Sequence, residues 1–312
     1  MRSAIGNPQP ALVIAGPTAV GKSEIATELA ERIDAEIINA DAFQLYAGLD
    51  LLTAKPDARA RKRVRHHLVG EFALSESMSV ARYLEFARAV VADIRSRRKA
   101  IVIVGGTGLY VRALIHGLSP GPAGNNEARQ EINALTDREA IEFLQREDPA
   151  AYERVDRRNP RRVQRALESA RLRGRSAPTE MMPGILATPA GAKVGVVLQR
   201  DRAELHHRIA RRTAEMFQLG VLAEVSALDP ARVGPTAAQM IGWRECLACA
   251  RGDISEDEAR ARIESATRQY AKRQTTWFKR ETALQPMLLM PDDSAAEVAR
   301  RIPEREFFAT TS

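Results

Sequence analysis

Residues Gly16-Pro17-Thr18-Ala19-Val20-Gly21-Lys22-Ser23 decide the fold of this chain. They match G-x-x-x-x-G-K-[ST], the pattern of a phosphate-binding loop, or P-loop. An apolar run at residues 11–15 comes directly before them, and Ile25, Leu29 and Ile33 follow at helical spacing. The sequence therefore predicts a strand, a tight glycine loop and a helix in that order, which is the context that such a loop requires.

The junction between this loop and its helix is suited to anions. Unpaired N–H groups and the positive end of the helix dipole collect there. Lys22 adds a point charge, and the hydroxyl of Ser23 can reach a Mg²⁺ ion bound to phosphates. The loop predicts a site for a diphosphate or a triphosphate with magnesium, and it leaves open which of the two is bound.

The composition is that of a basic globular protein. The chain has 312 residues, and its 47 Lys and Arg exceed its 40 Asp and Glu, for a net charge of +7. That balance suits either a nucleic acid or an anionic small substrate. No apolar stretch approaches membrane-spanning length and the first residues lack a secretory leader, so we expect a cytoplasmic protein with no membrane contact. A monomer is the default expectation.

The two cysteines, Cys246 and Cys249, have C-x-x-C spacing. A zinc site needs two more ligands, and the neighbouring sequence offers none. The spacing therefore favours two thiols on one helix over a metal or redox site.

Short apolar runs alternate with helical patterns in the first third of the chain. Residues 36–40 and 101–104 read as strands, and a helical stripe lies between them. The stripe consists of Val80, Leu84, Ala87, Val91 and Ile94. Residues 194–198 read as a strand that returns to the same sheet. This order predicts an α/β fold with a parallel, P-loop NTPase-like sheet flanked by helices.

The alternation stops at a segment rich in Gly and Pro, residues 119–126. Residues 127–173 are helical in pattern, and residues 174–192 are again rich in Gly, Pro and Ala. We therefore expect a catalytic core domain formed by 1–119 and 193–312. Residues 120–192 form an inserted, all-helical domain in this division.

The insert carries a concentration of arginine. Between residues 154 and 175 there are nine arginines and two acidic residues. Asn159 and Pro160 predict a helix start. The helix then brings Arg161 and Arg165 onto one face, while Val163 and Leu167 point toward a core. A single-signed arginine face suits contacts with a phosphate backbone, and a solvated helix face is the alternative.

The acidic residue that a motor or ATPase places after its second apolar strand has no counterpart after residue 104. Gly105-Gly106-Thr107-Gly108-Leu109-Tyr110 stands there instead. Asp41, however, follows the strand at 36–40, and ligands of doubly wound sheets bind at such strand ends. Asp41 could hold magnesium, act as a general base, or merely cap a helix.

Several segments together resemble the bacterial tRNA dimethylallyltransferases, or tRNA isopentenyltransferases. The resemblance extends from about residue 10 to about residue 282. It rests on residues 16–23, 41–50, 53–56, 66–68, 105–110, the arginine helix, 239–244 and 267–278. The loop alone is generic, but the whole set in this order is highly specific.

The resemblance implies an activity without phosphoryl transfer. In that family the loop holds the diphosphate of dimethylallyl diphosphate, and the dimethylallyl group passes to N6 of adenosine 37 in tRNAs that read codons beginning with U. Diphosphate leaves, and magnesium is implied as cofactor. Asp41 matches the family's general base, and Thr107 matches a threonine near the acceptor and the diphosphate. Arg212 matches an arginine tied to the diphosphate, in addition to Gly16, Pro17, Thr18, Ala19, Val20, Gly21, Lys22 and Ser23.

The same resemblance implies a set of tRNA contacts. Trp277 and Phe278, beside Lys272, Arg273 and Lys279, would suit base stacking and phosphate contact. The full set is Asp41, Ala42, Phe43, Gln44, Thr107, Arg129, Arg161, Arg162, Val163, Gln164, Arg165, Gln239, Met240, Ile241, Gly242, Trp243, Arg244, Lys272, Arg273, Gln274, Thr275, Thr276, Trp277, Phe278 and Lys279.

Two positions depart from the family pattern. Ala42 stands where serine is usual, and Leu52 stands where glycine is usual. Three other functions remain open: an isopentenyltransferase acting on free adenylate, an ATP-dependent kinase, and a non-catalytic RNA-binding protein. The insert and the basic C-terminal segment favour a tRNA substrate over the first of these.

Overall fold

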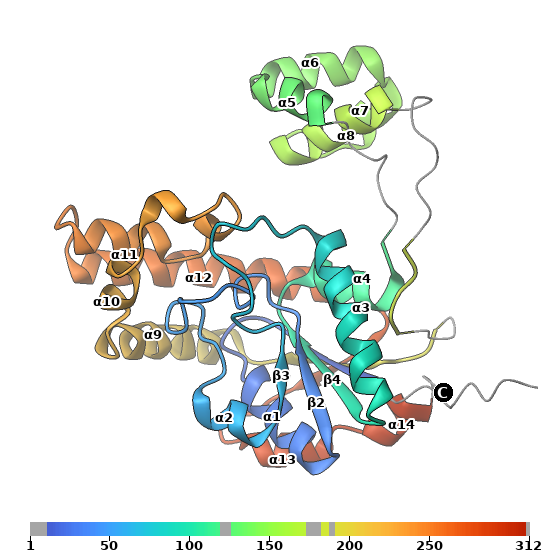
Figure 1. Cartoon of the computed structure of the whole chain (residues 1–312), viewed down its shortest axis with the longest axis vertical. Helices are drawn as coiled ribbons and strands as arrows, with labels where there is room; N and C mark the ends of the chain where they lie inside the picture. The colour runs from blue at the N-terminus through green and yellow to red at the C-terminus, as the bar shows by residue number, and fades with distance from the viewer. Residues whose placement is uncertain (1–10, 119–125, 173–181, 187–190, 310–312) are drawn as a thin grey trace, which may run out of the picture. The chain divides into compact units, whose positions relative to one another are not determined.

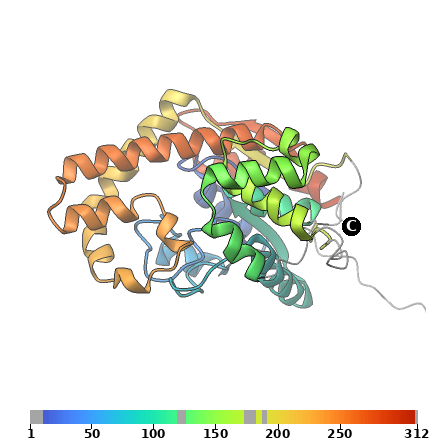
Figure 2. The same cartoon turned by 90° about the horizontal axis from the view of Figure 1, so that it is seen from above.

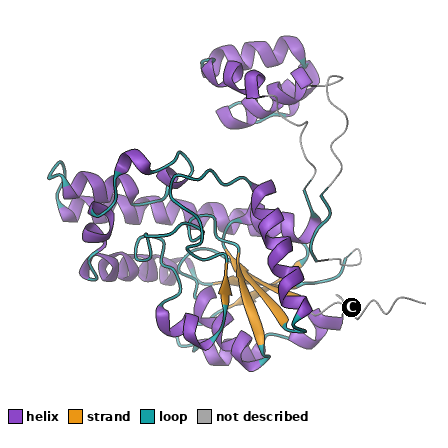
Figure 3. Cartoon of the chain, in the orientation of Figure 1, coloured by secondary structure: helices purple, strands orange, loops and turns teal. Residues whose placement is uncertain are grey.

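The computed structural model describes residues 11–118, 126–172, 182–186 and 191–309. The chain divides into two compact units, Met1–His116 with Gly184–Ser312, and Gly117–Pro183. The strands, all in the first unit, are β1 (Ala11–Ala15), β2 (Ala35–Asn39), β3 (His66–His67), β4 (Ala100–Gly105), β5 (Gly195–Gln199) and β6 (Leu284–Leu288). They form one parallel sheet in the order β3-β2-β4-β1-β5-β6 (Figure 3).

Helices cover both faces of this sheet (Figure 1). The helices of the first unit are α1 (Lys22–Arg32), α2 (Ala58–Arg63), α3 (Val80–Ser96), α4 (Gly108–His116), α9 (Arg202–Gln218), α10 (Val221–Ser226), α11 (Trp243–Ala250), α12 (Glu256–Phe278), α13 (Ala295–Arg301) and α14 (Glu304–Ala309), with 3-10 turns η1 (Pro230–Arg232) and η2 (Ala237–Gln239). Side chains of β1, β4 and β5 pack with α1 and α13 in one core. The stacked rings of Tyr83 and Tyr110, with centroids 3.9 Å apart, join α3 to α4.

Two long helices of this unit, α9 and α12, pack against each other. α12 begins near α11 and ends beside the sheet, and α9 packs next to it (Figures 1 and 2). Ser255 caps the start of α12 by accepting from the N–H of Glu258 at 3.2 Å. Side chains of both helices line the candidate site described below.

The four strands predicted from apolar runs are present, each within one residue of its expected start. The sequence reasoning missed β3 and β6. β3 has two residues, both histidines, and so offers no apolar run. β6 contains Pro286 and pairs with β5 at the edge of the sheet, where a missing backbone N–H is tolerated.

The described part of the second unit is helical. It contains α5 (Asn126–Ala134), α6 (Asp137–Glu147), α7 (Pro149–Arg154) and α8 (Pro160–Leu172). Val163 and Leu167 are buried in its core, and Asn159 accepts from the N–H of Arg162 at the start of α8. The unit ends at Pro183, because the N–H groups of Ile185 and Leu186 donate to Leu114 O in the first unit. The predicted joints at 119–126 and 174–192 lie largely outside the described residues.

Candidate active site

The loop at residues 16–23, here called the glycine loop, turns between β1 and α1 with three residues at positive φ. These are Gly16 (147°), Ala19 (62°) and Gly21 (107°). Gly16 also passes close to β5, because a Cβ on it would lie 2.7 Å from Leu198 O. A side chain at Gly16 is therefore excluded by space as well as by backbone conformation.

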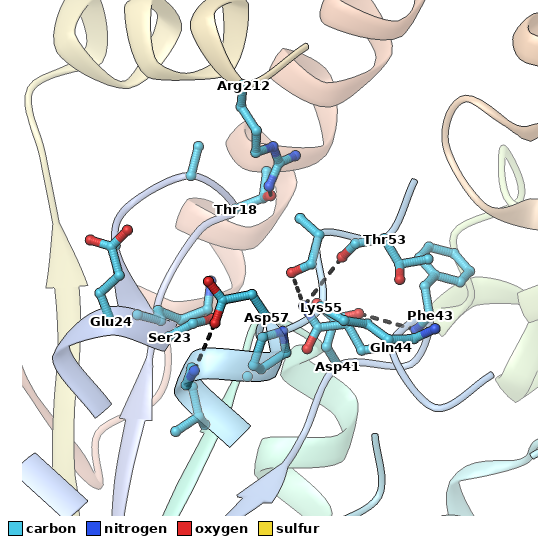
Figure 4. A pocket seen from close by; sticks show the side chains of 18 of the residues that line it. Thr18, Ser23, Glu24, Asp41, Phe43, Gln44, Thr53, Lys55, Asp57 and Arg212 are labelled. Atoms are coloured by element: carbon cyan, nitrogen blue, oxygen red, sulfur yellow. Dashed lines mark hydrogen bonds between the residues drawn. The ribbon is translucent and has the colours of Figure 1, made fainter. Parts of the chain in front are cut away.

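Three arginines donate hydrogen bonds to the glycine loop. The Nε atoms of Arg200 and Arg208 donate to Val20 O at 3.0 Å and to Ala19 O at 2.8 Å. Arg212 extends from α9 toward Thr18 and donates from Nη1 to its hydroxyl oxygen at 2.9 Å (Figure 4). Arg212 was tied to the diphosphate site only by the family resemblance. Arg200 and Arg208 were not expected there, because a contact with a backbone carbonyl has no sequence pattern.

Lys22 bridges the glycine loop and supplies a buried charge. Its Nζ donates to Pro17 O at 2.8 Å. Burial lowers the pKa of Lys22 to about 8, the nearby charge of Asp41 opposes that change, and the charge of Arg212 adds to it. The ammonium is thus charged at neutral pH in an environment where a bound anion would stabilise it further.

Gln274 joins the glycine loop to the end of β4. Its side chain is 5% exposed; Oε1 accepts from the N–H of Thr18 at 2.8 Å, and Nε2 donates to Gly106 O at 2.9 Å. A Cβ on Gly106 would lie 2.3 Å from that Nε2 atom. Gln274 was predicted as a tRNA contact; the structure gives both ends of its amide to the protein itself.

Asp41 and Thr107 lie together because β2 and β4 are neighbours. The N–H of Ala42 donates to the Thr107 hydroxyl oxygen at 2.9 Å, and the N–H of Thr107 donates to Ala40 O at 3.2 Å. Oδ1 of Asp41 accepts from the N–H of Phe43 at 3.1 Å. This Asx-type turn fixes the carboxylate beside the strand ends.

The charge of Asp41 acts on several groups around it. Burial lowers the pKa of Lys22 and of the Arg212 guanidinium, and the negative charge of Asp41 acts in the opposite direction on both. It also adds to the effect of burial in raising the pKa of the Tyr270 hydroxyl, which hydrogen-bonds to Thr107 and Gln274. Asp41 therefore faces the cationic side chains and α12 across a common space.

That space is a pocket of about 670 Å³. Its walls come from the glycine loop, from the segment that follows β2, and from α9 and α12 (Figure 4). The lining includes Thr18, Ala19, Gly21, Lys22, Ser23, Asp41, Phe43, Gln44, Leu52, Thr53, Lys55, Arg208, Arg212, Met216, Met240, Ile241, Ile263, Thr267 and Tyr270. One pocket thus combines the glycine loop, several cationic side chains and the carboxylate of Asp41, with Glu24 and Asp57 also in its wall.

The donor set suits a magnesium ion that depends on a phosphate ligand. No group of three or more His, Cys, Asp or Glu in the described part of the chain could hold a metal by itself. Ser23 and Asp41 nevertheless offer a hydroxyl and a carboxylate to the same pocket. Hard oxygen donors of this kind, few in number, match the way Mg²⁺ binds together with substrate phosphates.

The predicted tRNA contacts fall into exposed and buried groups. Gln239, Arg244, Lys272, Arg273, Thr276 and Lys279 are exposed. Met240, Gly242, Trp243 and Phe278 are buried, and of these four residues Met240 lines the pocket. Trp277 is 37% exposed and covers Gly108, where a Cβ would lie 2.2 Å from its ring. Of the predicted aromatic pair, only Trp277 thus has an accessible ring.

Two predicted tRNA contacts, Phe43 and Gln44, belong to the segment after β2, and the side chain of Gln44 is hydrogen-bonded within the protein. Phe43 and Gln44 both line the pocket. Nε2 of Gln44 donates to Thr53 O at 3.2 Å and to Ala54 O at 2.9 Å (Figure 4). Gln44 thereby holds the turn that precedes the buried ammonium of Lys55, which is paired with Asp50 at 2.6 Å.

In the second unit, α8 presents an arginine face. Arg161, Arg162 and Arg165 are exposed, and Val163 is buried. Arg165 pairs with Glu168 at 2.8 Å, and Arg162 lies 3.6 Å from Asp156. Gln164 is half-buried, and the side chain of Arg129, on α5, lies outside the described residues.

The remaining sequence expectations concern thiols and membranes. Cys246 and Cys249 are both free and share α11, as expected. Burial raises the pKa of the Cys246 thiol to about 12, so it is not a reactive thiolate. Within the described ranges, no helix combines the length and the apolar character that crossing a membrane requires.

Comparison with known proteins places this arrangement in a family. The model of the IPP transferase family matches residues 44–281. The chain is 40% identical to tRNA dimethylallyltransferase 2 of Geotalea uraniireducens, over 86% of this chain and 89% of that protein. It is 38% identical to the tRNA dimethylallyltransferase of Maricaulis maris, over 92% and 95%.

A solved structure agrees with these sequence matches. The full-length tRNA isopentenylpyrophosphate transferase of Bacillus halodurans superposes with a TM-score of 0.67 at 31% identity, covering 94% of this chain and 95% of that one. The overall fold of that enzyme thus recurs together with the sequence similarity. The chain belongs to the IPP transferase family of prenyl-transferring enzymes.

Proposed function

We propose that this enzyme transfers a dimethylallyl group from dimethylallyl diphosphate to N6 of adenosine 37 in tRNAs that read codons beginning with U. The proposal rests on one observation above all: Asp41 faces the cationic glycine loop within a single pocket. The loop takes the leaving group, and Asp41 takes the proton of the acceptor. The names of the relatives supply the donor and the acceptor.

The glycine loop suits a diphosphate leaving group. An allylic carbon bonded to diphosphate is already a good electrophile, so catalysis mainly requires stabilised charge on the departing oxygen and an acceptor held in line. Lys22 and Arg212 provide positive charge, and backbone N–H groups of the loop can donate hydrogen bonds to the phosphate oxygens. Ser23 would hold a magnesium ion, with Asp41 also in the pocket, and such an ion neutralises phosphate charge.

The transfer exchanges one bond for another. The C–O bond to diphosphate breaks, and a C–N bond to N6 forms. N6 of adenine is a poor nucleophile and loses a proton as the new bond develops, and Asp41 accepts that proton. Thr107 fixes the position of Asp41 through the N–H of Ala42, and its hydroxyl meets Tyr270.

The acceptor base must leave the anticodon stack to enter such a pocket. Exposed cations on α8 and at the end of α12, with Arg129 and Gln239–Arg244, supply the proposed contacts with the RNA. Trp277 offers an accessible ring for stacking. We also propose that the enzyme acts as a monomer in the cytoplasm, where tRNA is abundant.

Asp41→Asn should lower kcat about 100- to 10,000-fold. The amide keeps an oxygen for the N–H of Phe43, and thus the turn, but it cannot take the proton. Prenyl transfer to an anticodon stem-loop RNA measures kcat, and filter binding should give nearly unchanged affinity for the RNA. Asp93→Asn, on the exposed face of α3, is the matched control. Unchanged kcat in Asp41→Asn would remove Asp41 as the base.

Diphosphate affinity should fall as pH rises through the pKa of Lys22. That pKa is about 8, so the ammonium is mostly charged at pH 7 and mostly neutral at pH 9. Calorimetry with inorganic diphosphate should show about tenfold weaker binding at pH 9, after subtraction of the change seen in Lys22→Gln. The variant is neutral at both pH values and reports the titration of the ligand itself. Parallel pH profiles for the two proteins would contradict the role of Lys22.

Replacing Arg161 and Arg165 together by Ala should weaken tRNA binding and reduce its salt dependence. The slope of log K against log[salt] should become shallower by roughly one to two units, because fewer counterions are released. Arg138→Ala, an exposed arginine of α6 paired with Glu142, is the control. If the double variant keeps the slope of the unaltered protein, Arg161 and Arg165 do not contact the RNA backbone and belong to a solvated helix face.

A further inference from the structure

The carboxylate of Glu224, on α10, binds the backbone of a turn that is distant in the sequence. The turn comprises residues 49–55 and is here called the leucine turn. Oε1 of Glu224 accepts from the N–H of Leu51 at 2.8 Å, and Oε2 accepts from the N–H of Leu52 at 2.9 Å. Each oxygen of the carboxylate thus has its own backbone donor, and hydrogen bonds to an ionised acceptor are stronger than those to a neutral one.

The leucine turn keeps its shape through hydrogen bonds of its own. The N–H of Thr53 donates to Leu49 O at 3.3 Å, and the N–H of Lys55 donates to Asp50 O at 3.0 Å. Lys55 and Asp50 are also paired through their side chains at 2.6 Å. Glu224 therefore does not make the turn; it connects an already shaped turn to α10 and so determines where the turn lies.

The position of the leucine turn determines how the amide of Gln44 is oriented. Nε2 of Gln44 donates to Thr53 O at 3.2 Å and to Ala54 O at 2.9 Å. The nitrogen of an amide carries both of its hydrogens, so two carbonyl acceptors require the nitrogen on that side. The amide oxygen, Oε1, is then the opposite end of a side chain that lines the pocket. Among the described residues, no donor is hydrogen-bonded to this Oε1.

The amino group of an adenine brings two hydrogens into the pocket. In the proposed transfer, Asp41 accepts one of them as the C–N bond forms. The other hydrogen stays on N6, and a buried N–H without an acceptor costs free energy. Asp41 and Gln44 line the same pocket from one segment, three residues apart (Figure 4). A carboxylate and an amide oxygen are thus available for the two hydrogens.

We propose that Glu224 is a positioning residue for the acceptor base. Through the leucine turn it holds the Gln44 amide with Oε1 open to the pocket, and Oε1 accepts the hydrogen that N6 keeps. The inference rests on the proposed function, because it takes the acceptor to be an adenine amino group. Glu224 is not among the residues that line the pocket, so it acts through the turn and not on the base itself.

The test compares the binding of two stem-loop RNAs in the absence of donor. One has adenosine at the acceptor position, and the other has purine riboside, which lacks the amino group. Filter binding gives the ratio of their affinities, and Gln44→Ala should lower the preference for adenosine about three- to tenfold. Glu224→Gln should lower it similarly, because the new amide group directs its own hydrogens at one of the backbone donors of the turn.

A double variant separates positioning from a general structural effect. If Glu224 acts through Gln44, Glu224→Gln should change the ratio little further in a protein that already carries Gln44→Ala. Glu215→Gln is the matched control, because Glu215 is an exposed residue of α9 that pairs with Arg211 at 3.5 Å. Calorimetry with inorganic diphosphate reports folding, and each variant should bind it as the unaltered protein does.

Three results would overturn the proposal. They are an unaltered protein without preference for adenosine, a ratio in Glu224→Gln equal to that in Glu215→Gln, and full additivity in the double variant. If Glu224→Gln loses diphosphate binding, Glu224→Asp carries the comparison, because it keeps the charge on a shorter side chain. Prenyl transfer is measured separately, and its absence would contradict the proposed function while the binding ratios still decide the role of Glu224.

Discussion

The buried amide of Gln274 is the interaction on which the site depends. Its oxygen accepts from the N–H of Thr18, and its nitrogen donates to Gly106 O. One side chain of α12 thus connects the glycine loop after β1 to the end of β4. Gly106 must lack a side chain for this contact to form. The amide thereby fixes where the loop lies relative to Thr107, and through Thr107 relative to Asp41.

The arginines complete what Gln274 begins. Arg200 and Arg208 donate to carbonyl oxygens of the loop, while Arg212 donates to the Thr18 hydroxyl oxygen. These contacts fix the backbone of the loop at the wall of the pocket, which Arg208 and Arg212 also line. This geometry and the family relationship support the proposal that the pocket binds a prenyl donor with an anionic head.

Much of this arrangement could be predicted from the sequence because it is local. The apolar runs and the glycine spacing predicted β1, β2, β4 and β5, and the position of Asp41 after a strand predicted its approach to the loop. The contacts of Arg200, Arg208 and Gln274 join residues more than 150 positions apart through backbone groups, which leave no pattern in one sequence. Trp243 and Phe278 are buried because helices pack over them, and the sequence motifs that contain them carry no information about that packing.

The proposed function requires that the glycine loop holds a leaving group and that no phosphoryl group is transferred. Mass spectrometry of nucleosides from unmodified tRNA, incubated with the protein, dimethylallyl diphosphate and Mg²⁺, tests it most directly. The account predicts one adenosine of the anticodon loop heavier by a C5H8 unit, with one diphosphate released for each. Unmodified adenosine in that reaction, together with phosphoryl transfer when ATP is supplied instead, would contradict it.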